Sequence, residues 1–421
     1  MLHINKIREN KDSYITLLKL KNIDATDLFD SVIAKDNERK ATQQQSDELL
    51  AKGNQFAKQI GEMYKTGKVA EANLLKEESA LIKEESKALQ TKQIELEKEI
   101  QSILVQIPNI PHPSVPKGKS DLDNIILKEV GKIPNLMKGA KPHWELTTDY
   151  NLIDFALGNK ITGAGFPVYI DKGARLQRAL ISYFLDKNTA AGYIEYLPPH
   201  LVNEASGFGT GQLPDKEGQM YHANEDNLYL IPTAEVPVTN FFRNVIVDKF
   251  PIMCTAYTPC FRREAGSYGK EVRGLNRLHQ FDKVEIVQVQ HPNKSYETLD
   301  LMVSHVASIL DELELPYKIL QLCGGDLSFT SAITFDFEVY SAGQERWLEV
   351  SSVSNFESYQ ANRLKLRYKD GNGKTQLCHT LNGSALALPR IYAALIENNQ
   401  TAQGIKIPKA LQPYTGFDII K

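Results

Sequence analysis

Charged side chains crowd around a glycine-bearing loop between Thr258 and Val289, where two strand-like segments flank the loop. The charged residues are Arg262, Arg263, Glu264, Lys270, Arg273 and Arg277, with Gly266 and Ser267 among them. Arginine offers a planar fork that matches phosphate oxygens, and it stays charged at any physiological pH. The stretch therefore predicts a site that grips a polyphosphate. A solvated hairpin with water-facing arginines is the plainer alternative.

A second chemical feature is Glu285, which lies in the segment Val284–Val289. This segment is apolar on both faces, which is typical of a central strand. Since side chains alternate along a strand, Glu285 shares a face with Val287 and Val289, where a carboxylate is costly unless it is paired and hydrogen-bonded. The residues alone leave two partners equally open, a bound substrate or a nearby arginine in an internal salt bridge.

Common nucleotide and metal motifs are missing from the sequence. It contains neither a GxGxxG turn nor a P-loop GxxxxGK[ST], so a nucleotide must be held differently than in folds built on parallel sheets. The four cysteines, none in a CxxC pair, are Cys254, Cys260, Cys323 and Cys378. They indicate reduced, mostly buried thiols and no zinc site.

The N-terminal region has a strong helical pattern. Between about Asp27 and Ile107 it lacks proline and is rich in Lys, Glu, Gln, Ala and Leu. Apolar residues recur every seven positions at Leu75, Ile82, Leu89, Leu96 and Ile103, and a weaker series is Thr42, Leu49, Phe56 and Met63. The segment Gly61–Gly67 can reverse the chain, so we predict a projecting arm of two antiparallel helices. An ordinary core helix pair and a dimerising coiled coil are the alternatives.

Four prolines between Ile107 and Pro116 stop the helix and form a semi-rigid linker. We therefore predict a first domain at residues 1–110 and a second at residues 111–421. In the second domain, Arg175–Ala191 has a helical pattern and leads into the strand-like segment Tyr193–Pro199. Another strand is predicted where Phe335, Phe337 and Val339 alternate with acidic residues.

Composition excludes several classes of protein. The chain has 421 residues, 42% hydrophobic and 24% charged, with a net charge of −3 and a pI of about 6.3. It can bury a large core, and it lacks the global basic excess that would by itself announce nucleic-acid binding. No run reaches the length of a membrane span, and the N-terminus shows no presequence pattern. We expect a cytosolic protein with no membrane partner.

The order of the motifs resembles the seryl-tRNA synthetase family of class II aminoacyl-tRNA synthetases. The matching segments are Pro232–Pro237, Cys260–Ser267, His279–Glu285, Leu348–Ser352 and His379–Ser384. The resemblance extends from Ile7–Asn10 to Pro408–Tyr414. It implies an α+β chain, in which an N-terminal coiled-coil arm of two antiparallel helices precedes a catalytic domain with an antiparallel sheet and flanking helices.

The resemblance also implies an ATP site. Arg262 would contact the α-phosphate and Arg390 the γ-phosphate, and these two are the predicted catalytic residues. Phe281 would stack on adenine, and Glu264 would contact either the adenine amino group or the ribose side of the pocket. Further ATP contacts are expected at Arg263, Leu278, Glu349, Val350, Ser351 and Ser352. A Mg²⁺ ion bound with ATP would be held by Glu349 and Ser352; because Trp347–Val350 is otherwise apolar, we expect Glu349 not to face solvent.

The amino-acid pocket that the resemblance implies would bind L-serine. Its residues are Thr233, Ala234, Glu235, Arg262, Glu285 and Ser384. A pocket that hydrogen-bonds a hydroxyl rejects alanine strongly, because its own polar groups would be left unpaired.

The implied macromolecular partners are tRNA(Ser), tRNA(Sec) where one exists, and a second copy of the chain. The arm would contact tRNA through Lys52, Lys58, Lys65 and Lys68, and Arg175–Pro199 would form the homodimer. The implied reaction is activation of serine with ATP, followed by transfer to tRNA. The alternatives are a threonyl or prolyl synthetase, a ligase that loads a carrier protein, and an inactive paralogue.

Overall fold

The computed structural model describes residues 1–215, 217–264 and 273–421, and these form two compact units. The helical unit comprises Leu2–Leu18 and Ile23–Pro108. The sheet unit comprises Asn109–Lys421 together with Met1 and Lys19–Asn22. The two units thus divide after Pro108. The assignment of residues 1–110 to tRNA binding and of residues 111–421 to catalysis stays a prediction.

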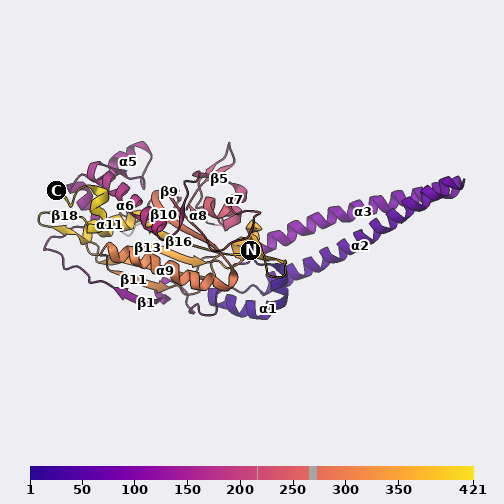
Figure 1. Cartoon of the computed structure of the whole chain (residues 1–421), viewed down its shortest axis with the longest axis horizontal. Helices are drawn as coiled ribbons and strands as arrows, with labels where there is room; N and C mark the ends of the chain where they lie inside the picture. Colours follow the sequence, from indigo (N-terminus) through magenta and orange to yellow (C-terminus); the bar gives the residue numbers. More distant parts are fainter. Residues whose placement is uncertain (216, 265–272) are drawn as a thin grey trace. The chain divides into compact units, whose positions relative to one another are not determined.

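The helical unit contains helices α1 (Ile4–Leu18), α2 (Thr26–Lys65) and α3 (Val69–Leu104). Helices α2 and α3 run side by side as a long hairpin (Figure 1), which confirms the predicted pair of antiparallel helices. All nine residues of the two heptad series are buried or half-buried. The chain reverses at 66–68, where Gly67 has a positive φ of 77°. The predicted turn segment was Gly61–Gly67. The reversal lies at its C-terminal end, because Gly61 is still inside α2.

One buried carboxylate secures the base of this hairpin. Asp36 is 2% exposed and forms ion pairs with Arg8 at 2.6 Å, Arg39 at 2.9 Å and Lys40 at 3.1 Å. Burial acts to raise the pKa of Asp36, but the hydrogen bonds from the three cations outweigh it and hold the pKa below its ordinary value. Because Arg8 lies on α1, these pairs tie α1 to the first turns of α2.

An eight-stranded sheet forms the centre of the sheet unit, in the order β1-β11-β12-β13-β16-β10-β9-β4. Its strands are β1 (Ile125–Val130), β4 (Ile194–Glu195), β9 (Ile252–Phe261), β10 (Gln280–Gln290), β11 (Tyr317–Gln321), β12 (Ile333–Ser341), β13 (Arg346–Asn355) and β16 (His379–Ala387). Neighbouring strands are antiparallel except β4, which pairs with β9 in parallel. The predicted antiparallel sheet is therefore confirmed, with a short parallel strand at one edge.

Three helices pack on this sheet: α6 (Asp171–Ala190), α9 (Ser295–Glu312) and α11 (Leu388–Asn398). They share one hydrophobic core with β10 through Val284 and Ile286. On the opposite face of β10, Val287 packs against α8 (Glu235–Asn240). The predicted central strand is thus buried on both faces, and Glu285 lies on the face toward α8.

The remaining helices are short: α4 (His143–Asp149), α5 (Phe155–Ile161), α7 (Glu204–Thr210), α10 (Tyr359–Leu364) and α12 (Gln412–Thr415). The minor sheets consist of β2 (Ile153–Asp154) with β3 (Val168–Tyr169); β5 (Leu201–Asn203), β6 (His222–Ala223) and β7 (Leu228–Leu230); β8 (Ile246–Val247), β14 (Arg367–Lys369) and β15 (Thr375–Leu377); and β17 (Gln400–Thr401), β18 (Gly404–Lys406) and β19 (Ile419–Ile420).

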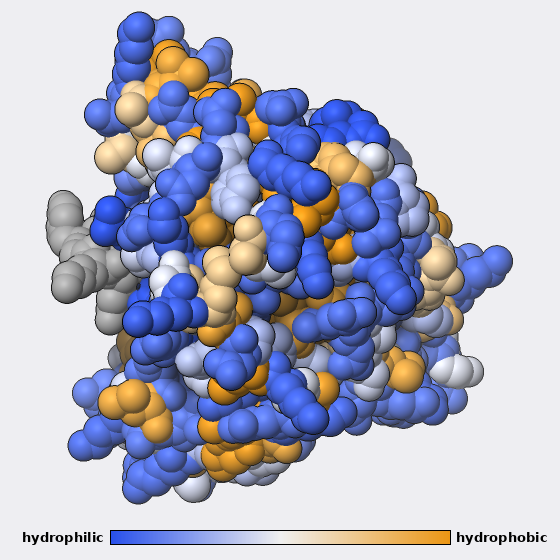
Figure 2. Space-filling model, turned by 90° about the vertical axis from the view of Figure 1, so that its left-hand side faces the viewer, coloured by the Kyte–Doolittle hydropathy of each residue, from blue (hydrophilic) through white to orange (hydrophobic). Residues whose placement is uncertain are grey.

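Polar side chains predominate on the face in Figure 2, where apolar side chains gather in separate small patches. In the described ranges, no helix combines the length and the apolar character that crossing a membrane requires.

Candidate active site

The two long strands β9 and β10 position the arginine-rich loop. They pair in register, with Cys260 opposite Phe281 and Phe261 opposite Gln280. Arg262 follows β9, and its N–H donates to the carbonyl of His279 at 2.9 Å, so the pairing continues one step into the loop. The Arg262 guanidinium lies 5.2 Å from the centre of the Phe281 ring. The predicted phosphate-binding arginine and the predicted adenine-stacking ring therefore lie together.

Part of the predicted phosphate-binding loop lies outside the described residues, namely Gly266, Ser267 and Lys270. Beside it, Arg263 lies over the Tyr221 ring at 4.9 Å and donates through Nε to the carbonyl of Met220 at 3.2 Å. Glu264 forms an ion pair with Arg277 at 3.1 Å. The sequence did not single out Tyr221 and Met220, because they precede the loop by about forty residues.

Arg390 approaches the same region from the first turn of α11. Its Nη1 donates to the Glu349 carbonyl at 2.8 Å and lies 3.7 Å from the Glu349 carboxylate. The prediction that Glu349 avoids solvent is wrong, because its side chain is 52% exposed. Leu348 and Val350 both face the hydrophobic core, so strand alternation turns Glu349 to the open face.

Carboxylates gather where β12 and β13 pair. Glu338 is opposite Glu349, and Asp336 is opposite Ser352 and hydrogen-bonded to it. Burial, followed by the charge of Glu349, raises the pKa of Asp336 well above its ordinary value. Asp336 Oδ1 is also buried without a hydrogen-bond partner. Hard oxygen donors with spare capacity suit a divalent cation, although the described residues include no preformed group of three or more His, Cys, Asp or Glu ligands.

The side chains of three predicted ATP residues are not available to a ligand. Leu278 and Val350 belong to the main hydrophobic core. Ser351 is 2% exposed, and its hydroxyl donates to the carbonyl of Ser384 at 2.5 Å. A nucleotide could therefore contact only the backbone of these residues. Their side chains instead pack in the core or bond a neighbouring strand.

Glu285 lies in a buried polar cluster between β10 and α8. Its partner is Lys283, whose Nζ lies 2.6 Å from Glu285 Oε2. The hydroxyl of Thr233 donates to the same oxygen at 3.1 Å. The internal salt bridge of Glu285 is therefore made with a lysine, and not with the nearby arginine that the sequence suggested. Burial raises the pKa of Glu285, against the opposing effects of Lys283, Thr233 and Arg262.

A second buried carboxylate, Glu235, belongs to this cluster. Gln360 donates to its Oε1 at 2.6 Å, and its own N–H donates to the hydroxyl of Thr233 at 3.2 Å. Burial, followed by repulsion from Glu285, raises the pKa of Glu235 to about 7. Gln360 and Asn382, which also hydrogen-bonds Glu235, were not predicted. Their side chains come from α10 and β16, far from Glu235 in sequence.

The remaining predicted pocket residues have two different roles. Ser384 lies directly opposite Glu285 in the pairing of β10 with β16, so the two side chains share a face. Ala234 is fully buried among apolar residues and packs α8 on the sheet. The structure thus brings Thr233, Glu235, Glu285 and Ser384 together, with Arg262 close enough to act on the charge of Glu285.

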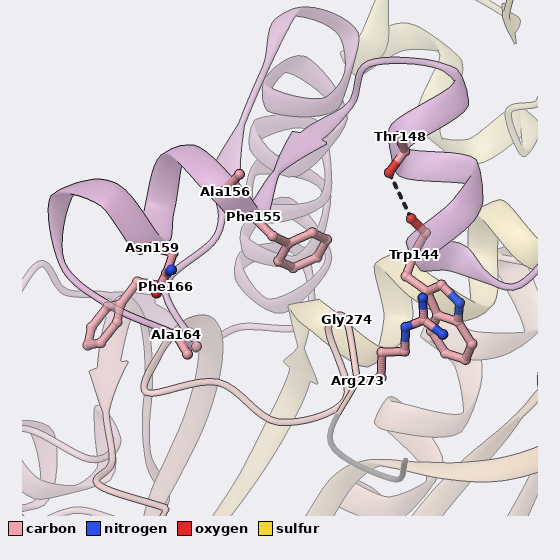
Figure 3. Close-up of a pocket in the computed structure, with 10 residues that line it drawn as sticks. Trp144, Thr148, Phe155, Ala156, Asn159, Ala164, Phe166, Arg273 and Gly274 are labelled. Atoms are coloured by element: carbon pink, nitrogen blue, oxygen red, sulfur yellow. Dashed lines mark hydrogen bonds between the residues drawn. The ribbon is translucent and has the colours of Figure 1, made fainter. Parts of the chain in front are cut away.

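A cavity of about 560 Å³ opens beside the returning limb of the loop (Figure 3). Aromatic side chains line it, including Trp144, Phe155 and Phe166, and the Arg273 guanidinium lies 4.9 Å from the centre of the Trp144 ring. None of the predicted ATP-binding or serine-binding residues lines it.

The four predicted tRNA-binding lysines are exposed on the helical unit. Lys65 and Lys68 flank the reversal of the chain, and Lys52 lies farther along α2. Lys52 pairs with Glu78 at 3.2 Å and Lys68 with Glu71 at 3.6 Å, so an RNA phosphate would have to compete with these weak surface pairs.

The comparisons with known proteins agree with this arrangement. Residues 219–399 match the tRNA synthetase class II core domain (G, H, P, S and T), and residues 1–111 match the seryl-tRNA synthetase N-terminal domain. The chain is 47% identical to the serine–tRNA ligase of Salinibacter ruber, over 99% of this chain and 98% of that one. It is also 47% identical to the serine–tRNA ligase of Chlorobaculum parvum, over the full length of both.

Among solved structures, the chain resembles the seryl-tRNA synthetase of Pyrococcus horikoshii complexed with ATP, with a TM-score of 0.92 and 33% identity. This match covers 100% of the chain and 99% of that structure. The sheet, the helical hairpin and these matches define a class II aminoacyl-tRNA synthetase. Within that class, the chain belongs to the seryl-tRNA synthetase family.

The raised pKa of Glu235 predicts a pH-dependent stability. The pKa is about 7 in the folded protein, against 4.5 for an ordinary glutamate. The folded protein therefore holds this proton more tightly than the unfolded chain. The resulting stability is fully present below about pH 4.5 and is lost as the pH rises to about 7, by up to about 3 kcal/mol.

We expect urea unfolding of the ligand-free protein to show this decline, and the Glu235→Gln variant to show a smaller one. The decline that remains comes from other buried carboxylates such as Glu285 and Asp336, whose pKa burial also raises. The exposed Glu297 provides a matched control, and Glu297→Gln should behave as the unsubstituted protein does. An equal decline in Glu235→Gln would contradict the assignment.

Proposed function

We propose that this chain activates L-serine with ATP to seryl-adenylate and pyrophosphate, and then transfers the seryl group to the 3′ end of tRNA(Ser). One observation carries the choice of an amino-acid substrate. The buried polar cluster holds two carboxylates, Glu235 and Glu285, but a single lysine, Lys283. The α-ammonium group of an amino acid supplies the missing positive charge, since buried carboxylates require a cationic or hydrogen-bonding partner.

The arrangement of charges fits both ends of a bound amino acid. Its ammonium group faces Glu235 and Glu285, and Arg262 lies on the side where its carboxylate meets the α-phosphate. Adenylate formation needs that carboxylate to attack phosphorus in line with the departing pyrophosphate. Arg262 and Arg390 contribute by positioning the phosphates and stabilising charge as it develops. Phe281 offers its ring to adenine.

Mg²⁺ fits the pair Glu349 and Ser352. The ion usually takes one or two protein oxygens and completes its coordination with water and phosphate oxygens. Glu349 offers an exposed carboxylate next to Arg390, and Ser352 offers a hydroxyl that Asp336 already orients. When bound, the ion would neutralise phosphate charge. These residues would hold it, and no zinc site is part of the proposal.

The RNA substrate is the partner of the helical unit. The match of residues 1–111 to the seryl-tRNA synthetase N-terminal domain supports a tRNA partner. Between Glu71 and Ile100 glutamates outnumber lysines, so recognition relies on shape and on the lysines near the hairpin tip. We infer tRNA(Ser) as the substrate, tRNA(Sec) where one exists, and the cytosol as the location, because tRNA charging serves translation.

We also propose a homodimer. Strand β4 is an edge strand of the large sheet. Ile194 within it is 58% exposed, and Leu197 just after it is 80% exposed. Exposed apolar edges are suited to pairing with another chain. This edge directly follows α6, where the resemblance places the dimer-forming element of the family.

The first prediction from this proposal concerns the two arginines. Arg262→Ala and Arg390→Ala should each lower serine-dependent ATP–pyrophosphate exchange by on the order of 10², the scale of one lost preorganised charge contact. Thermal unfolding should change little. Arg367→Ala is the matched control, because this arginine lies in a minor sheet and its Nε donates to the carbonyl of Lys365. A normal exchange rate in either site variant would remove that arginine from the site.

The second prediction concerns the arm. Excising residues 48–84 and joining the ends by a short glycine–serine linker retains the Asp36 ion pairs and the Lys35–Glu99 and Glu38–Lys92 pairs. Pyrophosphate exchange should persist, while transfer of serine to tRNA should be almost completely lost. In the full chain, replacing Lys52, Lys58, Lys65 and Lys68 by glutamate should weaken tRNA binding and flatten its salt dependence. If the shortened enzyme charged tRNA as well as the full chain, the arm would have no role in RNA binding.

The third prediction concerns assembly. Sedimentation should give a mass of about twice the 47.3 kDa of one chain. Leu197→Asp should shift the protein toward monomer, because it places a charge on the proposed interface. Leu301→Asp is the control, since Leu301 is 64% exposed on α9. A monomer at micromolar concentration in the unsubstituted protein would exclude the dimer.

A further inference from the structure

A buried hydrogen-bond network surrounds Glu397, a fully buried residue outside the proposed site. Its carboxylate accepts five hydrogen bonds: from His143 N and His143 Nδ1, both at 2.7 Å, from Gly343 N and Gln344 Nε2, both at 3.1 Å, and from the hydroxyl of Ser341. A buried carboxylate is tolerated only where such donors compensate for lost water. The network thus ties α4 and the β12–β13 turn to the end of α11.

His143 extends this network to the arginine-rich loop. Its Nε2 accepts a hydrogen bond from the N–H of Leu275 at 2.8 Å, so the ring proton lies on Nδ1 and is donated to Glu397. Gly274 packs directly on the ring. A Cβ at that position would lie 2.2 Å from His143 Nε2, and the backbone φ of 68° also favours glycine. His143 therefore holds the chain where the loop returns to the sheet.

The next residue of the loop connects the network to Arg390. Asn276 donates through Nδ2 to Gln344 Oε1 at 2.9 Å, and Gln344 donates to Glu397. The carbonyl of Asn276 accepts from Arg390 Nε at 3.1 Å. Arg390 and Glu397 are seven residues apart on α11, so they lie on one face of the helix. These hydrogen bonds form a closed ring. It runs from Arg390 at the start of α11, through Asn276 and Gln344, to Glu397 near the end of the same helix.

We propose that His143 is a positioning residue for adenylate formation, which acts through Leu275 and Asn276 to fix Arg390 against the loop that carries Arg262. This inference rests on the proposed function. An arginine fixed at Nε keeps its outer guanidinium nitrogens in a set direction toward the phosphates, and small displacements of such a group are costly to the rate. The serine pocket is formed by other elements and does not depend on the network.

Two substitutions separate the two hydrogen bonds of the ring. His143→Asn keeps a donor near the place of Nδ1 and loses the acceptor for Leu275. His143→Gln places an amide oxygen near Nε2 and loses the donor to Glu397. We expect His143→Asn to lower kcat/KM for ATP in pyrophosphate exchange by about 10-fold or more while KM for serine holds, and His143→Gln to restore most of the rate. If His143 were merely structural, the exchange rate of each variant would follow its thermal stability. His143→Gln, which loses the donor to Glu397, would then be as slow as His143→Asn.

A double-mutant cycle gives the decisive comparison. In the Arg390→Ala background, His143→Asn should cost little further rate, since its effect passes through Arg390. His305→Asn is the control, because His305 is half-buried on α9 and bonds Asn188 at 2.7 Å; its effect on exchange should be small. Should the His143 variants not fold, Asn276→Ala breaks the same ring at Gln344 and should show the same loss of rate.

The outcomes distinguish the two levels of inference. If Arg390→Ala alone left exchange unchanged, the proposed site would fail. If Arg390→Ala lowered exchange but His143→Asn kept its full effect in that background, only the positioning role would be overturned. Equal rates in His143→Asn and in the unsubstituted protein would also overturn it.

Discussion

The ion pair between Lys283 and Glu285 is the constraint on which the site depends. Both side chains lie on β10, an interior strand of the sheet. Their charged groups are 2.6 Å apart and almost completely removed from solvent. Such a pair is costly to bury and adds little stability by itself. With Glu235 beside it, this buried cluster carries an excess of negative charge when Glu235 is ionised. Where Glu235 is ionised, above about pH 7, the cationic ligand proposed for this region would balance that charge.

The antiparallel sheet explains how the other groups reach this region. The pairing of β9 with β10 brings Arg262 and Phe281 together, although nineteen positions separate them in the sequence. Strand β16 pairs with β10 on its other side and leads directly into α11, which presents Arg390. Strand β13 completes the surface with Glu349 and Ser352. Three strand pairings therefore set the geometry of a site whose residues span more than 150 positions.

Local pattern in the sequence was enough to predict the helical hairpin, the central strand and the two strands that flank the arginine-rich segment. Those features depend on heptad spacing, on alternation and on motifs within one segment. The prediction for Glu349 was wrong, because an apolar run does not reveal which face of a strand packs on the core. The reversal of the arm was located only approximately, since Gly61 is tolerated inside a long exposed helix.

Sequence reasoning missed the groups that arrive from distant elements. Gln360, Asn382 and Asp336 contact predicted residues, but α10, β16 and β12 bring them there only in the folded chain. His143 and Glu397 are separated by more than 250 residues and form one hydrogen-bonded unit. No periodicity or short motif links such positions. The motifs identify the residues proposed to contact the ligands, and the tertiary structure identifies the residues that support them.

The most direct test of the central claim is the amino-acid dependence of ATP–pyrophosphate exchange by the unsubstituted protein. If the buried carboxylates form a pocket for serine, exchange should depend on serine, and kcat/KM for alanine should be lower by about 10⁴, because the pocket leaves polar groups unpaired when the hydroxyl is missing. Threonine and proline should support little exchange. Exchange supported equally by alanine, threonine or proline would contradict the account.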